Sequence, residues 1–295
     1  MNYHHLLEKF RTEHILRGSS PRTIKSYVNN CRMIFEYLQK EPSEITNDDL
    51  RQYIHHLIDK SYEAKTCNQK IYSIKSFYNF LGEEGKENAA THLPRQKEPV
   101  KIPQILGKKD LSLVLGSLTN QKHRALLTTA YYAGLRLNEV RLLKVTDIDS
   151  ARMVILVNGK GNKQRLVPLF QKSLDLLREY YKNYKPKKWL FEGRGGNRPL
   201  CSRSLHEIVK HAVRLAGIKK RVSMHTLRHC FATHLLENGV AMQTIQHVLG
   251  HKDIVTTAHY THVTDEMIAR VKSPLSDLNS SDEEKPLEEK GGCDE

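Results

Sequence analysis

Apolar residues recur every three or four positions along most of the chain, which is the spacing of amphipathic helices. In the first ninety residues this pattern predicts a bundle of four short helices, three of which we place at 20–38, 47–57 and 71–81. Asn47 is expected to cap the second of these, because its short polar side chain can accept hydrogen bonds from the first turn. The lysines near the start of the third helix, Lys70 among them, are expected to face solvent.

The stretch 91–106 interrupts this pattern with three prolines, several basic residues and no periodicity, a composition typical of a semi-extended linker. Beyond it, three alternating segments at 145–149, 153–159 and 164–169 predict a small β-meander. Helices are expected around this meander at 109–117, 121–134, 137–144, 171–184, 203–216, 225–238, 241–249, 254–260 and 264–272.

These elements predict a fold that is mainly α with a small antiparallel β-sheet. We expect a helical N-terminal domain over residues 1–90, a linker over 91–106 and an α+β domain over 107–275. The polar, acidic segment 276–295 has almost nothing to bury, so it is expected to be a disordered tail.

The distribution of charge indicates the kind of partner. The net charge is +14 with a pI near 9.5, and residues 101–273 hold 30 basic and 12 acidic side chains. A domain with such an excess of positive charge is typical of proteins that bind a polyanion, with nucleic acid as the first candidate.

Composition excludes several other classes of protein. The chain has 39% hydrophobic residues and a mean hydropathy of -0.57, and it contains no apolar run long enough for a membrane span or a signal peptide. Its five cysteines are scattered without a CxxC pair, which argues against a disulfide framework or a cysteine zinc site. We therefore expect a cytoplasmic protein.

Side chains suited to catalysis form five clusters in the basic half of the chain. Taken singly, each has an ordinary explanation: a cation at a helix end, a charged hairpin tip, a polar helix start or a core tyrosine. The residues are Arg136 in AGLRLNEV, Lys160 in GKGNKQR, His225 and Arg228 in MHTLRH, His251 in LGHKD, and Tyr260 in TTAHYTHV.

Two other kinds of site are disfavoured. His225 and His229 have the spacing of a zinc pair on a helix, but Thr226 stands where the zincin pattern requires glutamate. The GKGNK loop has glycines like a phosphate-binding loop, yet it joins two strands instead of leading into a helix. We therefore expect neither a metal nor a nucleotide cofactor.

The order of the clusters resembles the tyrosine recombinase (phage integrase) family, and in particular its short, Xer-like members. The segments GKGNKQRLVPL, LRHCFATHLLENGV and IQHVLGHKDIVTTAHYTHV are similar to signature segments of that family. The resemblance covers roughly residues 5–272 and includes the N-terminal bundle, which resembles the family's SAM-like core-binding domain. It implies a site-specific DNA recombinase that works through a covalent 3′-phosphotyrosine, without metal or ATP.

The resemblance implies that Arg136 and Arg228 clamp the non-bridging oxygens of the scissile phosphate, with Glu139 as a supporting acidic residue. Guanidinium groups suit this role because each is a permanently charged, rigid fork that can bind two oxygens. The transition state carries more negative charge on these oxygens than the ground state does, so fixed cations accelerate the reaction.

The remaining roles implied by the family concern the nucleophile and the protons. Tyr260 attacks the phosphate, and because an ordinary tyrosine has a pKa of about 10, it needs a cationic pocket and a base at neutral pH. His225 assists proton transfer or binds the same phosphate, Lys160 protonates the leaving 5′ oxygen, and His251 adds a further phosphate contact.

The partner implied is double-stranded DNA carrying specific recombination sites, bound by a homo-tetramer or together with a second recombinase. An amphipathic C-terminal segment (Met267, Ile268, Val271, Leu275, Leu278) is expected to form a helix that docks on a neighbouring protomer, and the alternative is a helix that closes its own core. No additional N-terminal module for arm-site binding is expected. Candidate DNA contacts are Arg95, Lys97, Lys101, Lys187, Lys188, Arg203, Lys219, Lys220 and Arg221.

Two alternative functions stay open at this stage. A type IB topoisomerase-like enzyme uses the same cleavage chemistry without a second DNA site. A catalytically silent DNA-binding protein on the same scaffold is the other alternative, and the complete set of Arg136, Lys160, His225, Arg228, His251 and Tyr260 argues against it.

Overall fold

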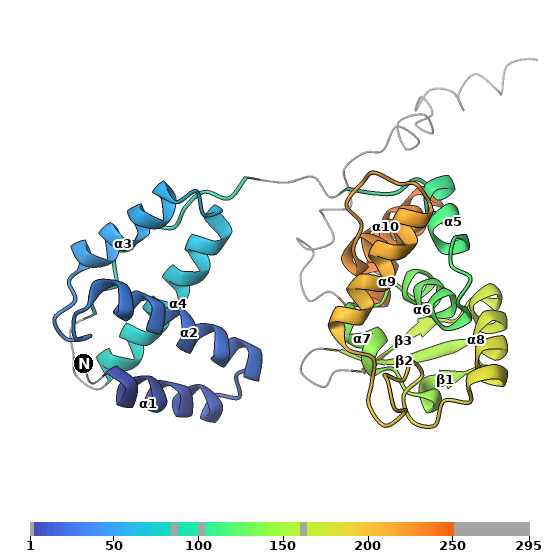
Figure 1. Ribbon diagram of the computed structural model, residues 1–295, viewed down its shortest axis with the longest axis horizontal. Coiled ribbons are helices and arrows are strands. Elements are labelled where there is room, and N and C mark those ends of the chain that lie inside the picture. Colours follow the sequence, from blue (N-terminus) through green and yellow to red (C-terminus); the bar gives the residue numbers. More distant parts are fainter. Residues whose placement is uncertain (1–2, 84–87, 100–103, 160–163, 251–295) are drawn as a thin grey trace, which may run out of the picture. The chain divides into compact units, whose positions relative to one another are not determined.

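The computed structural model describes residues 3–83, 88–99, 104–159 and 164–250 (Figure 1). The chain divides into two compact units, Met1–Lys101 and Ile102–Glu295, and the division falls inside the stretch 91–106. Across the described ranges, no helix is long and apolar enough to cross a membrane.

Within its described residues, the first unit contains four helices: α1 (Tyr3–Leu16), α2 (Pro21–Leu38), α3 (Asn47–Asp59) and α4 (Ala64–Glu83). The predicted cap of α3 is wrong by one residue, since Thr46 caps this helix and Asn47 is its first residue. The Thr46 hydroxyl accepts from the Asp49 amide at 3.2 Å, and the Asp49 carboxylate accepts from the Thr46 amide at 2.9 Å. This reciprocal capping box satisfies two backbone donors, which a lone asparagine cap cannot do.

Phenylalanines from three helices form the centre of the first unit. Phe10, Phe35 and Phe77 are at most 1% exposed, and the ring of Phe77 lies 5.3 Å from that of Phe10 and 5.1 Å from that of Phe35. These edge-on contacts hold α1, α2 and α4 together. The first unit therefore has a hydrophobic core of its own, as a separately folded domain requires.

The prediction that Lys70 faces solvent is wrong. Lys70 on α4 is only 4% exposed, and its ammonium lies 5.8 Å from the centroid of the Tyr53 ring on α3. Burial lowers the pKa of Lys70. Because α3 packs over the side of α4 that carries this lysine, the helical pattern of α4 alone could not show the burial.

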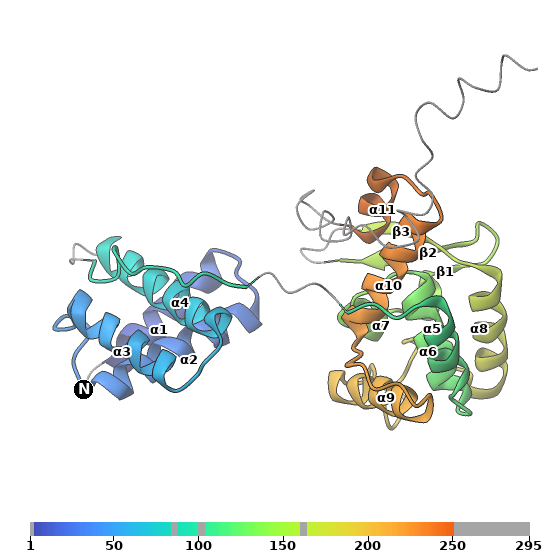
Figure 2. The same cartoon turned by 90° about the horizontal axis from the view of Figure 1, so that it is seen from above.

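In the part that the structure describes, the second unit combines helices with a three-stranded sheet and confirms the predicted fold class. Figures 1 and 2 show α8 beside the sheet, and Figure 2 shows α11 next to β3. Its elements are α5 (Lys108–Gly116), α6 (Gln121–Tyr132), α7 (Leu137–Leu142), a 3-10 turn (Val145–Asp147), β1 (Ile148–Asp149), β2 (Val154–Asn158), β3 (Gln164–Pro168), α8 (Gln171–Tyr184), α9 (Ser202–Leu215), α10 (Met224–Glu237) and α11 (Met242–Leu249).

The sheet is antiparallel in the order β1-β2-β3. In the β2–β3 ladder, Ile155 is paired with Val167 and Val157 with Arg165. Ile155, Val157 and Val167 are buried, so this face of the sheet lies against the core. Since side chains two residues apart on a strand share a face, Arg165 lies on the same inner face as Val167.

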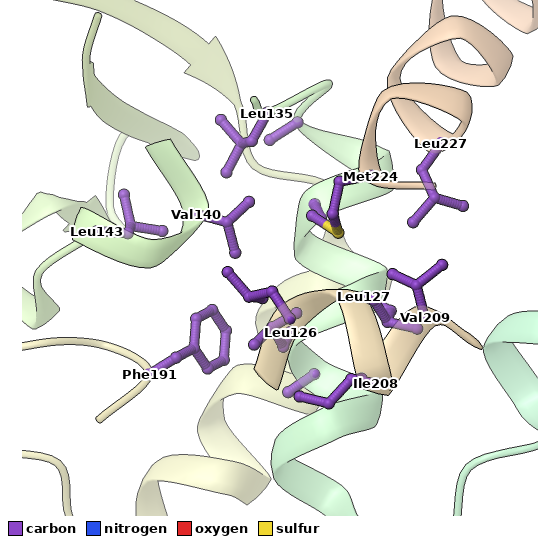
Figure 3. Close-up of a cluster of buried hydrophobic side chains, with 14 of the residues drawn as sticks. Leu126, Leu127, Leu135, Val140, Leu143, Phe191, Ile208, Val209, Met224 and Leu227 are labelled. Carbon is purple, nitrogen blue, oxygen red and sulfur yellow. The ribbon is translucent and has the colours of Figure 1, made fainter. Parts of the chain in front are cut away.

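A large core joins the helices that carry the candidate site. Figure 3 shows side chains of α6, α7, α9 and α10 meeting in one cluster. Packing of this kind sets the positions of α7 and α10 relative to each other to within fractions of an ångström, which a catalytic site requires. The labelled residues are Leu126, Leu127, Leu135, Val140, Leu143, Phe191, Ile208, Val209, Met224 and Leu227, all at most 6% exposed.

Polar contacts attach the start of the second unit to α10. The amide of Leu106 donates to Cys230 Sγ at 3.2 Å, and the Leu106 carbonyl lies 3.0 Å from Nε2 of His234. Because a carbonyl can only accept, Nε2 of His234 donates to it, and Nδ1 of the same ring lies 2.9 Å from the Tyr131 hydroxyl. This network anchors α10, the helix that carries two of the candidate catalytic residues.

Candidate active site

The structure places four of the predicted site residues in the second unit. Arg136 immediately precedes α7, Glu139 lies in its first turn, and His225 and Arg228 lie in the first two turns of α10. Lys160, His251 and Tyr260, as well as the predicted docking segment with Met267, Ile268, Val271, Leu275 and Leu278, lie outside the described residues.

A tight turn between α6 and α7 brings Arg136 to α10. Gly134 in this turn has a φ of +57°, a conformation that favours glycine, and a Cβ added there would lie 2.5 Å from Cδ1 of Phe231. The close approach lets the Gly134 carbonyl accept from Nη1 of Arg228 at 2.6 Å. The glycine in the AGLR segment is therefore required by the turn itself.

Glu139 is the centre of the site and is 6% exposed. Its Oε1 accepts from Nη1 of Arg136 and from Nη1 of Arg165, both at 2.9 Å. Its Oε2 accepts from the Arg136 amide at 2.8 Å and from Nη2 of Arg165 at 2.9 Å, and it lies 3.8 Å from Nη1 of Arg228. One carboxylate thus meets three guanidinium groups, which leaves an excess of positive charge at the site.

The arginines keep Glu139 ionised despite its burial. Burial alone would raise the pKa of this carboxyl, but hydrogen bonds from Arg165 and Arg136 outweigh that effect and lower the pKa of Glu139 to about 2. The carboxylate is therefore charged at neutral pH, where it orients the arginines without neutralising them all.

The same arginines bind three consecutive carbonyl groups at the end of α11. Nε of Arg165 donates to the Val248 oxygen at 2.8 Å, and Nη2 of Arg228 to the Leu249 oxygen at 2.6 Å. Nη2 of Arg136 lies 3.3 Å from the Gly250 oxygen. Carbonyl groups at a helix C-terminus carry partial negative charge and have no partner within the helix, so cations there stabilise the helix end.

Access to solvent differs among the three arginines. The side chain of Arg136 is 33% exposed, whereas those of Arg165 and Arg228 are 9% and 4% exposed. His225 is exposed on α10, and its ring centroid lies 6.4 Å from that of His229. Among the site residues that the structure describes, Arg136 and His225 are therefore accessible to solvent, whereas Arg165 and Arg228 are buried.

Arg165 was not among the residues predicted from the sequence. The strand pattern contains a signal for it, because Arg165 shares the inward-facing side of β3 with the buried Val167. A charged residue on the buried face of a strand needs a partner of opposite charge, and Glu139 provides it. That partner lies on another element, so the strand pattern alone does not identify it.

The candidate DNA contacts that the structure describes lie at the surface, and Lys101 lies outside the described residues. Some of them have partners within the protein. The guanidinium of Arg95 lies 4.7 Å from the centroid of the Tyr72 ring, and the ammonium of Lys188 lies 5.3 Å from that of Trp189. Lys220 forms an ion pair with Asp110 at 3.6 Å. Their roles toward DNA stay predictions.

Replacing Glu139 by glutamine is expected to lower the free energy of unfolding of the second unit by about 3 kcal/mol. The neutral amide leaves buried guanidinium groups without their counter-charge. Because the folded pKa of about 2 lies below the ordinary value of 4.5, this stabilisation is complete above pH 4.5 and disappears as the pH falls toward 2. Urea unfolding at several pH values measures the difference between the two proteins.

A matched control is Glu207→Gln on α9, where an exposed glutamate pairs with Lys210 at 3.2 Å. Exposed pairs of this kind contribute at most about 1 kcal/mol. Equal stability of wild type and Glu139→Gln at pH 7 would contradict the charge balance described above, as would a difference that persists unchanged at low pH.

Comparison with known proteins shows the family of this chain. Residues 88–267 match the phage integrase family, and residues 6–85 match the phage integrase N-terminal SAM-like domain. The chain is 37% identical over 262 residues to the putative integrase/recombinase y4qK of Sinorhizobium fredii, covering 88% of this chain and 85% of that protein. It is 32% identical over 278 residues to the tyrosine recombinase XerC of Halalkalibacterium halodurans, covering 86% and 91%.

A solved structure shares the fold. The XerH site-specific recombinase bound to palindromic difH substrate matches with a TM-score of 0.72 at 22% sequence identity, over 89% of this chain and 82% of that one. The two family segments together span most of the sequence, and the predicted catalytic residues fall within the larger of them. This protein therefore belongs to the phage integrase family and is a Xer-like tyrosine recombinase, an enzyme of site-specific DNA recombination.

Proposed function

We propose that this recombinase cleaves a DNA strand by attack of Tyr260 on a backbone phosphate and that Arg136 and Arg228 bind that phosphate. The observation that carries the proposal is the convergence of these two arginines, from α7 and α10, on one buried carboxylate and one helix end. The resulting excess of positive charge suits a phosphodiester, whose oxygens gain negative charge in the transition state.

In the proposed cleavage step, the Tyr260 oxygen forms a bond to phosphorus and the bond to the 5′ oxygen breaks. The phenolic proton passes to His225, which is exposed on α10 three residues before Arg228. Lys160 delivers a proton to the departing 5′ oxygen, and His251 adds a contact to the phosphate. Atoms and charge balance without a metal ion.

Rejoining follows from the same chemistry in reverse. The tyrosine phosphodiester keeps the free energy of the broken DNA linkage, so a 5′ hydroxyl from another strand can attack it without ATP. Water must be kept from the intermediate until that hydroxyl arrives, because hydrolysis would leave a permanent break.

The proposed partner is double-stranded DNA with specific sites, bound by a homo-tetramer in the cytoplasm or by this protein with a second recombinase. Support for DNA comes from the net charge of +14, from its concentration in residues 101–273, and from the family. Arg95, Lys97, Lys187, Lys188, Arg203, Lys219, Lys220 and Arg221 are proposed to contact the DNA backbone.

The test uses a pool of duplexes with randomised central sequence, each nicked so that the short fragment beyond the break diffuses away. DNA that stays on the protein after denaturing washes is sequenced, which identifies the target, and the linked peptide is analysed by mass spectrometry. The tryptic peptide 253–270 contains Tyr260 as its single tyrosine, so its mass assigns the adduct. We expect the 5′-labelled side of the cleaved strand to stay with this peptide.

Each outcome distinguishes the functions considered. An adduct at Tyr260 on selected sequences, followed by strand exchange between two such duplexes, supports the proposal. Relaxation of supercoiled plasmid at any sequence without strand exchange favours a topoisomerase. Binding of DNA without any adduct favours a catalytically silent DNA-binding protein. A chelator is expected to leave the yield of adduct unchanged.

A further inference from the structure

We infer that Arg165 is a positioning residue for strand cleavage: it holds Glu139 and the end of α11 so that Arg136 and Arg228 face the phosphate. This inference rests on the proposed function, since it assigns a role within the same site. Arg165 contacts neither the proposed substrate nor the proposed nucleophile in this assignment and acts through Glu139.

The geometry of Arg165 is that of a fork bound to a carboxylate. Its Nη1 and Nη2 donate to Oε1 and Oε2 of Glu139, both at 2.9 Å. Two parallel bonds of this kind fix the plane of the carboxylate as well as its position. Its Nε donates in a third direction, to the Val248 oxygen at 2.8 Å. One side chain thus joins β3, α7 and α11.

Burial distinguishes Arg165 from Arg136, and the way it binds Glu139 distinguishes it from Arg228. Its side chain is 9% exposed, compared with 33% for Arg136, and it begins on the inward face of β3. Arg228 is still less exposed, at 4%, but its Nη1 lies 3.8 Å from Oε2 of Glu139, whereas both terminal nitrogens of Arg165 bind the carboxylate at 2.9 Å. Arg165 is therefore the strongest ligand of Glu139.

The bidentate pairing of Arg165 with Glu139 affects how much positive charge Arg136 and Arg228 can offer to the phosphate. With Arg165 in place, Arg136 uses one nitrogen on Glu139 Oε1 and keeps another directed at the Gly250 oxygen. Without Arg165, the carboxylate is free to rotate and pair more fully with Arg136 or Arg228. The cation that should neutralise the phosphate would then be neutralised by the protein.

Arg165 also contacts the end of α11. Gly250 has a φ of +64°, and a Cβ added there would lie 2.9 Å from Cδ of Arg165. The side chain of Arg165 therefore lies against the last turn of α11, directly before the predicted phosphate ligand His251 in the sequence. Displacement of this turn would change the three carbonyl contacts that the arginines make.

Substitution of Arg165 is expected to have different effects if Arg165 forms only a structural ion pair than if it is a positioning residue. A structural pair lowers the fraction of folded protein, and all activities fall together. A positioning residue alters the placement of charge around one phosphate, and misplacement of about 1 Å reduces a rate by about 100-fold. Removing the charge from the phosphate distinguishes the two roles, because a loss of folded protein slows cleavage of charged and uncharged substrates alike, whereas misplaced cations mainly slow cleavage of the charged one.

The experiment compares Arg165→Met and Arg165→Lys with wild type on the nicked duplex recovered by the selection described above. One version carries the natural phosphate at the cleaved position, and the other carries an uncharged methylphosphonate there. An uncharged methylphosphonate is stabilised less by nearby cations in the transition state than a phosphate is. We therefore expect both variants to cleave the phosphate duplex about 100-fold more slowly than wild type, and the methylphosphonate duplex less than about 5-fold more slowly. Affinity for the duplex, measured by anisotropy, should change less than about 3-fold.

Two further proteins complete the design. Arg152→Met changes an exposed arginine in the turn before β2 and should cleave both duplexes like wild type. The double variant Arg165→Met with Glu139→Gln removes both members of the bidentate pair at once. If Arg165 acts through Glu139, the double variant cleaves the phosphate no more slowly than the slower single variant.

Several results would overturn the inference: near-normal cleavage by Arg165→Lys, an equal loss on both duplexes, or additive losses in the double variant. If Arg165→Met fails to fold, the lysine variant and the double variant decide the outcome. Failure of wild type to form any adduct would instead refute the proposed function, so the two failures are distinguishable.

Discussion

Tyr260→Phe is expected to abolish the covalent protein–DNA adduct, with cleavage reduced to the background of the assay. Phenylalanine has nearly the same shape but no oxygen, so the bond to phosphorus cannot form. Binding of the duplex should persist, because the phosphate contacts are made by arginines and lysines. The measurement is the amount of 5′-labelled DNA that migrates with the denatured protein.

Tyr184→Phe is the matched control for this variant. Tyr184 ends α8 and is 47% exposed, and it lies outside the arginine cluster. The control should form the adduct at the wild-type rate. A labelled adduct that survives in Tyr260→Phe would refute the assignment of the nucleophile, and loss of DNA binding together with the adduct would indicate a structural effect instead.

Arg136→Lys is expected to slow adduct formation by about 100- to 1,000-fold, which corresponds to about 3 to 4 kcal/mol of transition-state stabilisation. The charge is retained, but the guanidinium of Arg136 uses separate nitrogens for Glu139 and for the Gly250 carbonyl. A lysine ammonium is a point charge and cannot keep that orientation while binding a phosphate oxygen. Single-turnover cleavage of the selected nicked duplex measures the effect.

The control for this change is Arg178→Lys on α8, which replaces an exposed arginine by the same residue. It should cleave at the wild-type rate. Affinity of Arg136→Lys for the duplex should fall little, since one phosphate contact among many is altered. A rate within a few-fold of wild type would show that bidentate binding by Arg136 is not needed, and the proposed clamp would then be wrong.

Much of the fold could be predicted from patterns in the sequence. Helices at 121–134 and 171–184 in the prediction correspond to α6 (Gln121–Tyr132) and α8 (Gln171–Tyr184), because apolar spacing and helix ends are local properties. The errors lie where a second element decides the outcome. Lys70 is buried because α3 covers it, and the cap of α3 is Thr46 because Asp49 completes a reciprocal pair.

In the candidate site, too, the residues that a sequence motif identifies were found, and the one whose role depends on another element was not. Arg136, Glu139, His225 and Arg228 were found in the sequence because their order and spacing resemble a known family. Arg165 was missed because its importance depends on Glu139, which lies on a different element. The distances between these side chains follow from the packing of α7, β3 and α10 around the shared core.

Most helix and strand positions, the concentration of positive charge and the identity of the residues available for chemistry can be found in the amino-acid sequence, since each depends on short stretches of neighbouring residues. The pairing of one buried carboxylate with three arginines, and of these arginines with three carbonyl groups at the end of α11, is seen only in the folded protein. Hydrogen bonds and ion pairs act over a few ångströms, and folding alone brings side chains from distant segments within that range.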